Sequence, residues 1–200
     1  QRAEMETVLS GLDINHRDRI EEVAERIVLL SDGAGQDVIE GFRDDIFDPK
    51  DQEAFAGIRN QYERALWLHI NAPTLFDEAM NARQADVFRQ SASCYSGFIA
   101  PKDLSVLEDE PSRQAFHHAV AEELGCEIDS VAVQVFKRLR PDTQTGEEVD
   151  LYQISVHHTR PPEIIDCVQA SELVSQEVVR AVSSHITYEP ANGHLEVLSK

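Results

Sequence analysis

The spacing of the apolar residues changes near residue 126, from helical steps to alternation. Before that point, apolar residues recur three and four positions apart with charged residues between them, which is typical of amphipathic helices. The clearest case covers residues 16–30. Its apolar positions are Ile20, Val23, Ala24, Ile27 and Leu30. The Asp-Gly-Ala-Gly run at 32–35 ends this helix, and a short helical segment follows over 36–42.

A second helix is predicted to begin at Asp48-Pro49, with Asp as the N-cap, and to end near Asn71. Its apolar stripe is Phe55, Ile58, Tyr62, Leu66, His69 and Ile70. Further helices are predicted over 74–89 and 111–124. The last of them would turn Phe116, Ala119, Val120 and Leu124 inward. The small and polar residues 91–101 between these two helices indicate a loop.

Alternation after residue 126 predicts strands over 129–138 and 150–158, joined as a hairpin by turn residues. A second hairpin is predicted from 178–188 and 194–198, with Asn192-Gly193 in its turn. Residues 163–169 fit either a short strand or a helical turn, and 170–176 are predicted to be helical. In the first hairpin the bases Lys137, Arg138 and Arg140 would pair across the strands with Glu147, Glu148 and Asp150.

Helices followed by strands indicate the α+β class. We expect a mainly helical subdomain over 1–125, packed on an antiparallel meander of four to five strands over 126–200, the two together forming one compact unit. Since the chain begins with Gln1, we also expect it to be part of a longer protein or a processed form.

The negative net charge of the chain argues against nucleic acid and anionic membranes as partners. The formal net charge is −19 over 200 residues, whereas DNA binders and proteins that bind anionic membranes need a basic surface. Direct nucleic-acid binding and membrane binding are therefore not expected. No apolar run is long enough for a membrane span. Three cysteines without close spacing favour a reducing compartment, so we expect a cytoplasmic protein.

Metal and cofactor motifs are weak. His118 and Glu122 lie four residues apart on a predicted helix, and Cys126 follows it, so these three are the candidate zinc ligands. No HExxH or CxxC pair supports them, and the prediction is no metal and no cofactor. The loop at 31–36 lacks the third glycine of a dinucleotide site, since Val38 stands there.

Two further groups of residues are expected to have structural and not chemical roles. Cys94 lies in a predicted loop, where a thiol could be reactive, but a half-buried helix boundary is the expected role. The acids Asp44, Asp45, Asp48 and Asp51 could bind a hard cation, yet they lack the spacing of a calcium loop. A solvated helix boundary is the expected reading of this acidic cluster.

Because no catalytic signature is present, the sequence predicts a non-catalytic protein-interaction or regulatory domain. Its partner would be a basic protein, attracted by the acidic field, or a second copy of the chain. Trp67 points about 100° away from Leu66 on its helix, at the edge of the apolar stripe, and is the candidate interface residue. Two alternatives stay open. One is a hydrolase-like or metal-dependent enzyme with a cleft lined by His and Cys, and the other is a small-molecule sensor domain.

Overall fold

The computed structural model describes residues 11, 13–42, 49–141, 145–169 and 171–199. It has the α+β architecture, with helices in the first half of the chain and antiparallel strands in the second. The acids Asp44, Asp45 and Asp48 lie outside the described residues. The chain divides into two compact units, residues 1–83 and 84–200, which are described separately below.

The first unit contains α2 (Ile14–Leu30), α3 (Gly33–Gly41), α4 (Pro49–Ala56), α5 (Gln61–Asn71) and the first part of α6 (Pro73–Arg89). Asp32 begins α3 as its N-cap, accepting a hydrogen bond from the backbone N–H of Gly35 at 2.6 Å. Arg83 donates to the other carboxylate oxygen of Asp32 at 2.7 Å. The glycines at 33 and 35 therefore lie in the first turn of a capped helix, which begins three residues before the predicted start at 36.

The predicted single helix over 49–71 is wrong, because the chain breaks between Gly57 and Asn60. Asn60 starts a new helix, α5, by accepting hydrogen bonds from two backbone N–H groups of the first turn. The predicted stripe is confirmed for Phe55, which is buried, but not for most of its members in α5. In α5 the buried residues are Ala65 and Leu68. Tyr62, Leu66 and Ile70 are exposed.

The second unit is built on one five-stranded antiparallel sheet with the order β1-β7-β6-β3-β2. Its strands are β1 (Tyr95–Ile99), β2 (Val131–Pro141), β3 (Glu148–Thr159), β6 (Ala181–Glu189) and β7 (His194–Ser199). A short 3₁₀ turn, Ile128–Ser130, leads into β2. Both predicted hairpins, β2–β3 and β6–β7, are confirmed.

Two local predictions in this unit are wrong. Residues 95–99, predicted as loop, form the edge strand β1, which pairs with β7 from the far end of the unit. The helix predicted over 170–176 is replaced by β5 (Glu172–Val178), which pairs with β4 (Glu163–Gln169). The first error arises because β1 owes its pairing to a distant segment. The second arises because short apolar runs fit both periods.

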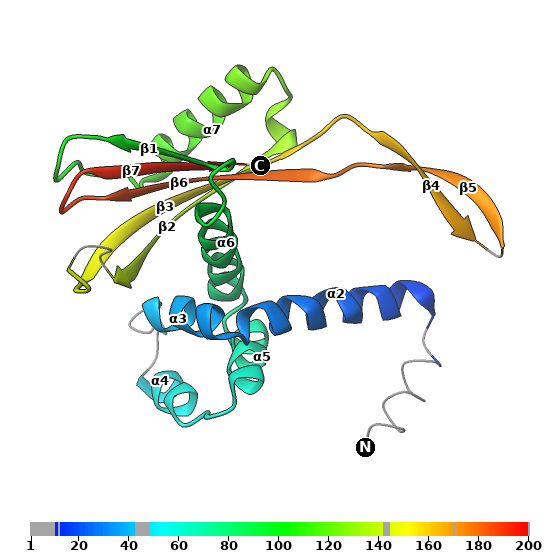
Figure 1. The fold of residues 1–200 in the computed structure, drawn as a ribbon, viewed down its shortest axis with the longest axis horizontal. Coiled ribbons are helices and arrows are strands. Elements are labelled where there is room, and N and C mark those ends of the chain that lie inside the picture. The colour runs from blue at the N-terminus through cyan, green and yellow to red at the C-terminus, as the bar shows by residue number, and fades with distance from the viewer. Residues whose placement is uncertain (1–10, 12, 43–48, 142–144, 170, 200) are drawn as a thin grey trace. The chain divides into compact units, whose positions relative to one another are not determined.

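One face of the sheet is apolar and lies under α7 (Glu110–Leu124), above the sheet in Figure 1. Ala121 packs there with Val131 and Val156. The predicted inward residues Phe116 and Val120 join this core. The prediction fails for Ala119 and Leu124, which are exposed. Asp109 caps the start of α7, and Gly125 ends it in the left-handed conformation at φ 64°.

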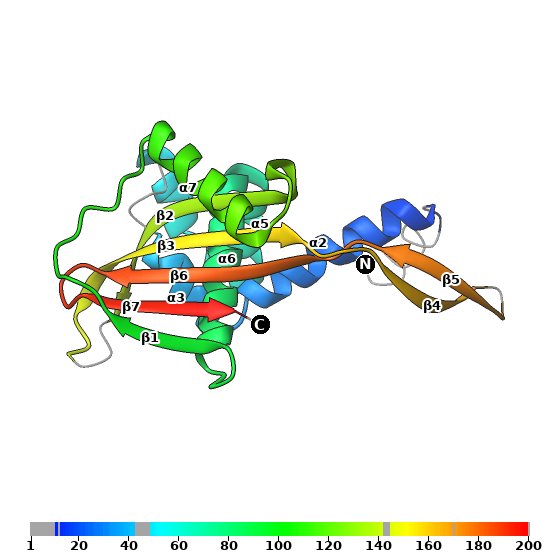
Figure 2. The same ribbon diagram turned by 90° about the horizontal axis from the view of Figure 1, so that it is seen from above.

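Strands β4 and β5 form a separate two-stranded ribbon, residues 163–178, which we call the arm. It is inserted between β3 and β6 and continues that strand pair beyond the sheet (Figures 1 and 2). A backbone hydrogen bond of 2.9 Å from Arg160 N to Arg180 O links the arm to the sheet. Within the described residues, β4 and β5 hydrogen-bond as strands only with each other.

Candidate functional site

The face of the sheet opposite α7 is buried and holds many polar residues beside a few apolar ones. Cross-strand pairing places the polar residues of β2, β3, β6 and β7 side by side on this face, since alternate residues of a strand share a side. The buried members are Arg138, Arg140, Gln153, Ser155, His185, Thr187, Glu189 and Glu196. The last turn of α6, from residue 84, contributes Asp86 and Arg89 to the same group.

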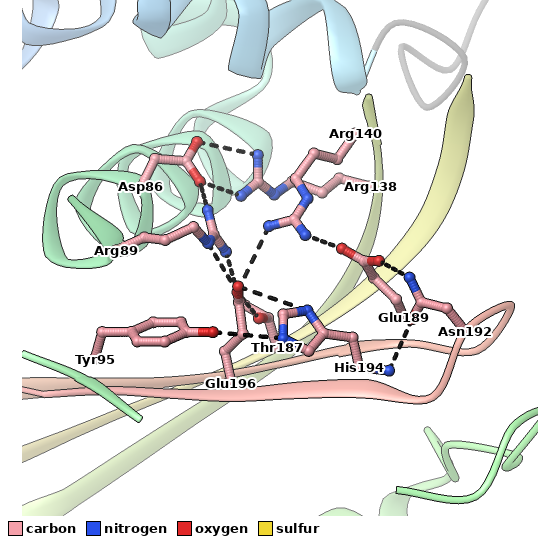
Figure 3. Close-up of polar contacts among 10 residues, drawn as sticks. All are labelled: Asp86, Arg89, Tyr95, Arg138, Arg140, Thr187, Glu189, Asn192, His194 and Glu196. Carbon is pink, nitrogen blue, oxygen red and sulfur yellow. Dashed lines mark hydrogen bonds and ion pairs between the residues drawn. The ribbon is translucent and has the colours of Figure 1, made fainter. Parts of the chain in front are cut away.

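Three arginines and three carboxylates form a charged cluster on this face, which Figure 3 shows in close-up. Its members are Asp86, Arg89, Arg138, Arg140, Glu189 and Glu196. Glu196 Oε2 accepts from Arg89 Nε at 2.8 Å and Nη2 at 2.6 Å, and from Thr187 Oγ1 at 2.6 Å. The formal charges of the cluster cancel, so it carries no excess charge to attract an ionic ligand.

The arginines set the protonation of their partners. Burial works to raise the pKa of Asp86, but the charges of Arg138 and Arg89 and their hydrogen bonds outweigh it and hold that pKa below its usual range. The pKa of Glu196 is set by the same two opposing effects. Burial acts to raise its pKa, and the hydrogen bonds and charge of Arg89 lower it. Both carboxylates are therefore ionised at neutral pH and tie α6 to the sheet.

The predicted charge ladder of the β2–β3 hairpin is correct for one pair. Lys137 Nζ lies 2.8 Å from Asp150 Oδ2, and both side chains are about half exposed. Arg138 and Arg140 instead turn to the other face of the sheet, where Arg138 pairs with Asp86 and Arg140 with Glu189. Alternation along β2 explains the split, because residue 137 points away from residues 138 and 140.

A hydroxyl and an imidazole also meet on the polar face. Ser155 Oγ lies 2.9 Å from His185 Nδ1, and Gln153 donates to the same hydroxyl at 3.2 Å. Burial, aided by the charges of His157 and Arg138, lowers the pKa of His185 to about 4. A nucleophile and base for hydrolysis would need substrate access and an acid on the second ring nitrogen. Ser155 and His185 are both fully buried, and Nε2 of His185 has no hydrogen-bond partner among the described residues.

The structure does not bring the candidate zinc ligands together. Among the described residues, no three His, Cys, Asp or Glu side chains gather closely enough to hold a metal ion. His118 and Glu122 are exposed on α7, whereas Cys126 packs against the apolar core under that helix. The neighbouring His117 donates from Nε2 to the carbonyl of Val131 at 2.8 Å.

The other two predicted site residues have local roles. Cys94 is half-buried just before β1, where its carbonyl accepts from Ser199 N at 2.9 Å. Trp67 is half-buried in the first unit, with its ring 5.3 Å from that of Phe55. This contact ties α5 to α4. None of the three cysteines, Cys94, Cys126 or Cys167, is in a disulfide.

The arm exposes apolar side chains on one of its two faces. The register pairs Val168 with Leu173 near the tip, Asp166 with Ser175 in the middle and Ile164 with Glu177 near the root. These six residues share one side, which we call the outer face. Its three apolar side chains, Ile164, Val168 and Leu173, are 76%, 74% and 71% exposed. On the opposite side Ile165, Cys167, Val174 and Val178 are only partly exposed.

Sequence reasoning missed this surface because it assigned half of the arm to a helix. Alternation did not reveal β5 either, because both of its sides mix apolar and polar residues: Glu172, Val174, Gln176 and Val178 lie on one side, and Leu173, Ser175 and Glu177 on the other. Comparison with known proteins adds nothing to the picture, since no family model, curated protein or solved structure matches the chain. Of the helices described, none is long and apolar enough to cross a lipid bilayer.

Proposed function

We propose that this protein is a non-catalytic protein-interaction domain that binds its partner on the outer face of the arm. The observation that carries the proposal is the exposure of Ile164, Val168 and Leu173 on a ribbon whose two strands, among the described residues, pair only with each other. A two-stranded ribbon is marginally stable alone in water and gains stability when a third layer or strand covers it. Exposed apolar side chains clustered on one element mark a contact site.

The energy available from such a contact is substantial. Fully burying an aliphatic side chain contributes about 1.5–3 kcal/mol, so three that are roughly three-quarters exposed would supply about 3–7 kcal/mol. The outer edges of β4 and β5 offer unpaired backbone groups as well, which a partner strand can use. The polar face of the sheet supports an enzyme less well, because its charged groups are paired with one another and its Ser155–His185 pair is buried.

A site-specific cross-linking experiment tests the proposal. A photo-reactive amino acid is placed at Leu173 on the arm, and in a second protein at Leu107, which is 63% exposed outside the arm. Both proteins are irradiated in lysate of the source cells, and cross-linked products are identified by mass spectrometry. We expect a discrete partner at position 173 that is absent at position 107.

Competition with an arm variant makes the result specific. Unlabelled wild-type protein in excess should abolish the cross-link at position 173, whereas unlabelled I164S/V168S/L173S should leave it intact. A matched control, V28S/I70S/L107S, alters three exposed apolar residues outside the arm and should compete like wild type. Equal competition by the arm variant would refute the proposal, and so would the absence of any discrete product at position 173.

A further inference from the structure

We infer that the partner segment bound by the arm is basic and apolar together, with Lys or Arg side chains set between apolar ones. This inference rests on the proposed function and specifies the chemistry of the partner. Between residues 163 and 178 the chain holds four acids and no Lys or Arg. These acids are Glu163, Asp166, Glu172 and Glu177, and all four are exposed.

Two of the four carboxylates lie among the apolar side chains of the outer face. Along β4 this face presents Ile164, Asp166 and Val168, and along β5 it presents Leu173, Ser175 and Glu177. The Ser175 hydroxyl donates to Asp166 Oδ1 at 2.7 Å, which orients that carboxylate on the ribbon. Same-face neighbours on a strand are about 7 Å apart, so each carboxylate lies next to an apolar side chain.

A partner that covers the apolar side chains must also meet these carboxylates. Burying an ionised carboxylate without a counter-charge is costly, so the covering surface needs cations at matching positions. A partner strand with alternating side chains would supply them at the same spacing of about 7 Å. Apolar anchors would then contribute most of the affinity, and the charges would contribute orientation and selectivity.

The same charges disfavour other occupants. A second copy of this chain would bring a net charge of −19 toward an arm that is itself acidic. Nucleic acid and anionic lipid are repelled for the same reason. Of the two partners that the sequence suggested, a basic protein and a second copy, the arm therefore favours the basic protein.

Synthetic peptides serve as the probe. Three fluorescent seven-residue peptides alternate Val with Lys, Val with Glu, or Val with Gln, and their binding is followed by anisotropy at low and physiological salt. We expect the Lys peptide to bind at least tenfold more tightly than the Glu peptide. We also expect its affinity to fall with added salt, as screening of surface charges requires. Equal or tighter binding of the Glu peptide would overturn the inference.

Two charge-reversed variants separate a specific contact from general attraction to an acidic protein. D166K/E177K reverses the carboxylates of the outer face, and E163K/E172K makes the same change in net charge on the opposite face. We expect the first to weaken the Lys peptide on the order of tenfold and the second by no more than about threefold. Equal weakening by both would overturn the inference.

A milder pair of substitutions controls for disruption of the arm's structure. D166N/E177Q removes the same two charges with almost unchanged shape, and Asn can still accept from Ser175. It should weaken the Lys peptide by about threefold to fivefold, with an unchanged circular dichroism spectrum. If cross-linking at position 173 succeeds but the Lys peptide shows no preference over the Glu peptide, the proposed function stands and this inference fails. If the cross-link is also absent, both fail.

Discussion

Replacing Glu196 by Gln should destabilise the second unit far more than replacing Asp150, which forms an almost equally close but exposed ion pair with Lys137. Glu196 is 4% exposed at its side chain and lies at the centre of the charged cluster. Its Oε2 atom accepts from Arg89 and Thr187 at 2.6–2.8 Å and lies 3.5 Å from Arg140 Nη1. The substitution keeps the size of the side chain but leaves three buried guanidinium groups facing two carboxylates.

The magnitude follows from burial. Removing one partner of a buried ion pair costs about 3–5 kcal/mol, because the other charge is left uncompensated in a poorly solvated site. The pair Lys137–Asp150 is almost as short, at 2.8 Å, but its side chains are 45% and 51% exposed. Exposed pairs contribute about 0.2–1 kcal/mol. Since a domain is stable by only about 5–15 kcal/mol in total, the first loss is large and the second small.

Urea denaturation followed by circular dichroism measures both changes. E196Q should lower the free energy of unfolding by about 3–5 kcal/mol at pH 7, and D150N by less than about 1 kcal/mol, with similar m-values. The double variant R89M/E196Q should lose less than the sum of the two single changes, because it removes an unpaired cation together with its partner. A loss for E196Q no larger than that for D150N would refute the reasoning.

Three further changes test other parts of the unit. The unfolded chain protonates His185 near pH 6.5, whereas in the folded protein its pKa is about 4. The free energy of unfolding should therefore fall by up to about 3 kcal/mol as the pH drops from 6.5 to 4. Urea titrations should show a smaller fall for H185Q. D109A removes the cap that accepts from Ser112 N at 3.0 Å and should lower the urea midpoint in the same assay. G193A should lower the melting temperature markedly, since Gly193 has φ 77° and a Cβ there would meet Ala100 O at 2.3 Å; a melting temperature within a degree or two of wild type would contradict the steric argument.

Local pattern was sufficient for elements whose partners are close in sequence. Helical spacing predicted α2, α6 and α7, and alternation with Asn192-Gly193 predicted the β6–β7 hairpin. The same reasoning failed for β1, since Tyr95–Ile99 carries no alternation of its own and, in the part of the chain that the structure describes, pairs only with β7. It also predicted α4 and α5 as one helix, because the break between them is only four residues long and hardly disturbs the helical spacing of apolar residues. The break ends at Asn60, the N-cap of α5.

The charged cluster was beyond the reach of this approach for a different reason. Alternation shows that Gln153, Ser155 and His157 share one side of β3, but it does not show whether that side faces water. Polar residues at period two normally indicate the solvent face of a sheet. Here this face is buried, and Asp86 and Arg89 reach it from the last turn of α6. Neighbouring acids therefore seemed the natural partners of Arg138 and Arg140.

The pairing of β1 with β7 has a consequence for the order of folding. The hairpins β2–β3 and β6–β7 close over short turns, and such local pairs form within microseconds. Tyr95 and Leu198, by contrast, are partners about 100 residues apart in the chain, and closing so long a loop is slow and entropically costly. β1 should therefore join the sheet late, leaving an uncharged strand free to pair with other chains while folding is incomplete. Refolding yield should accordingly fall as protein concentration rises, and a lysine placed in β1 on the side exposed to solvent should restore it.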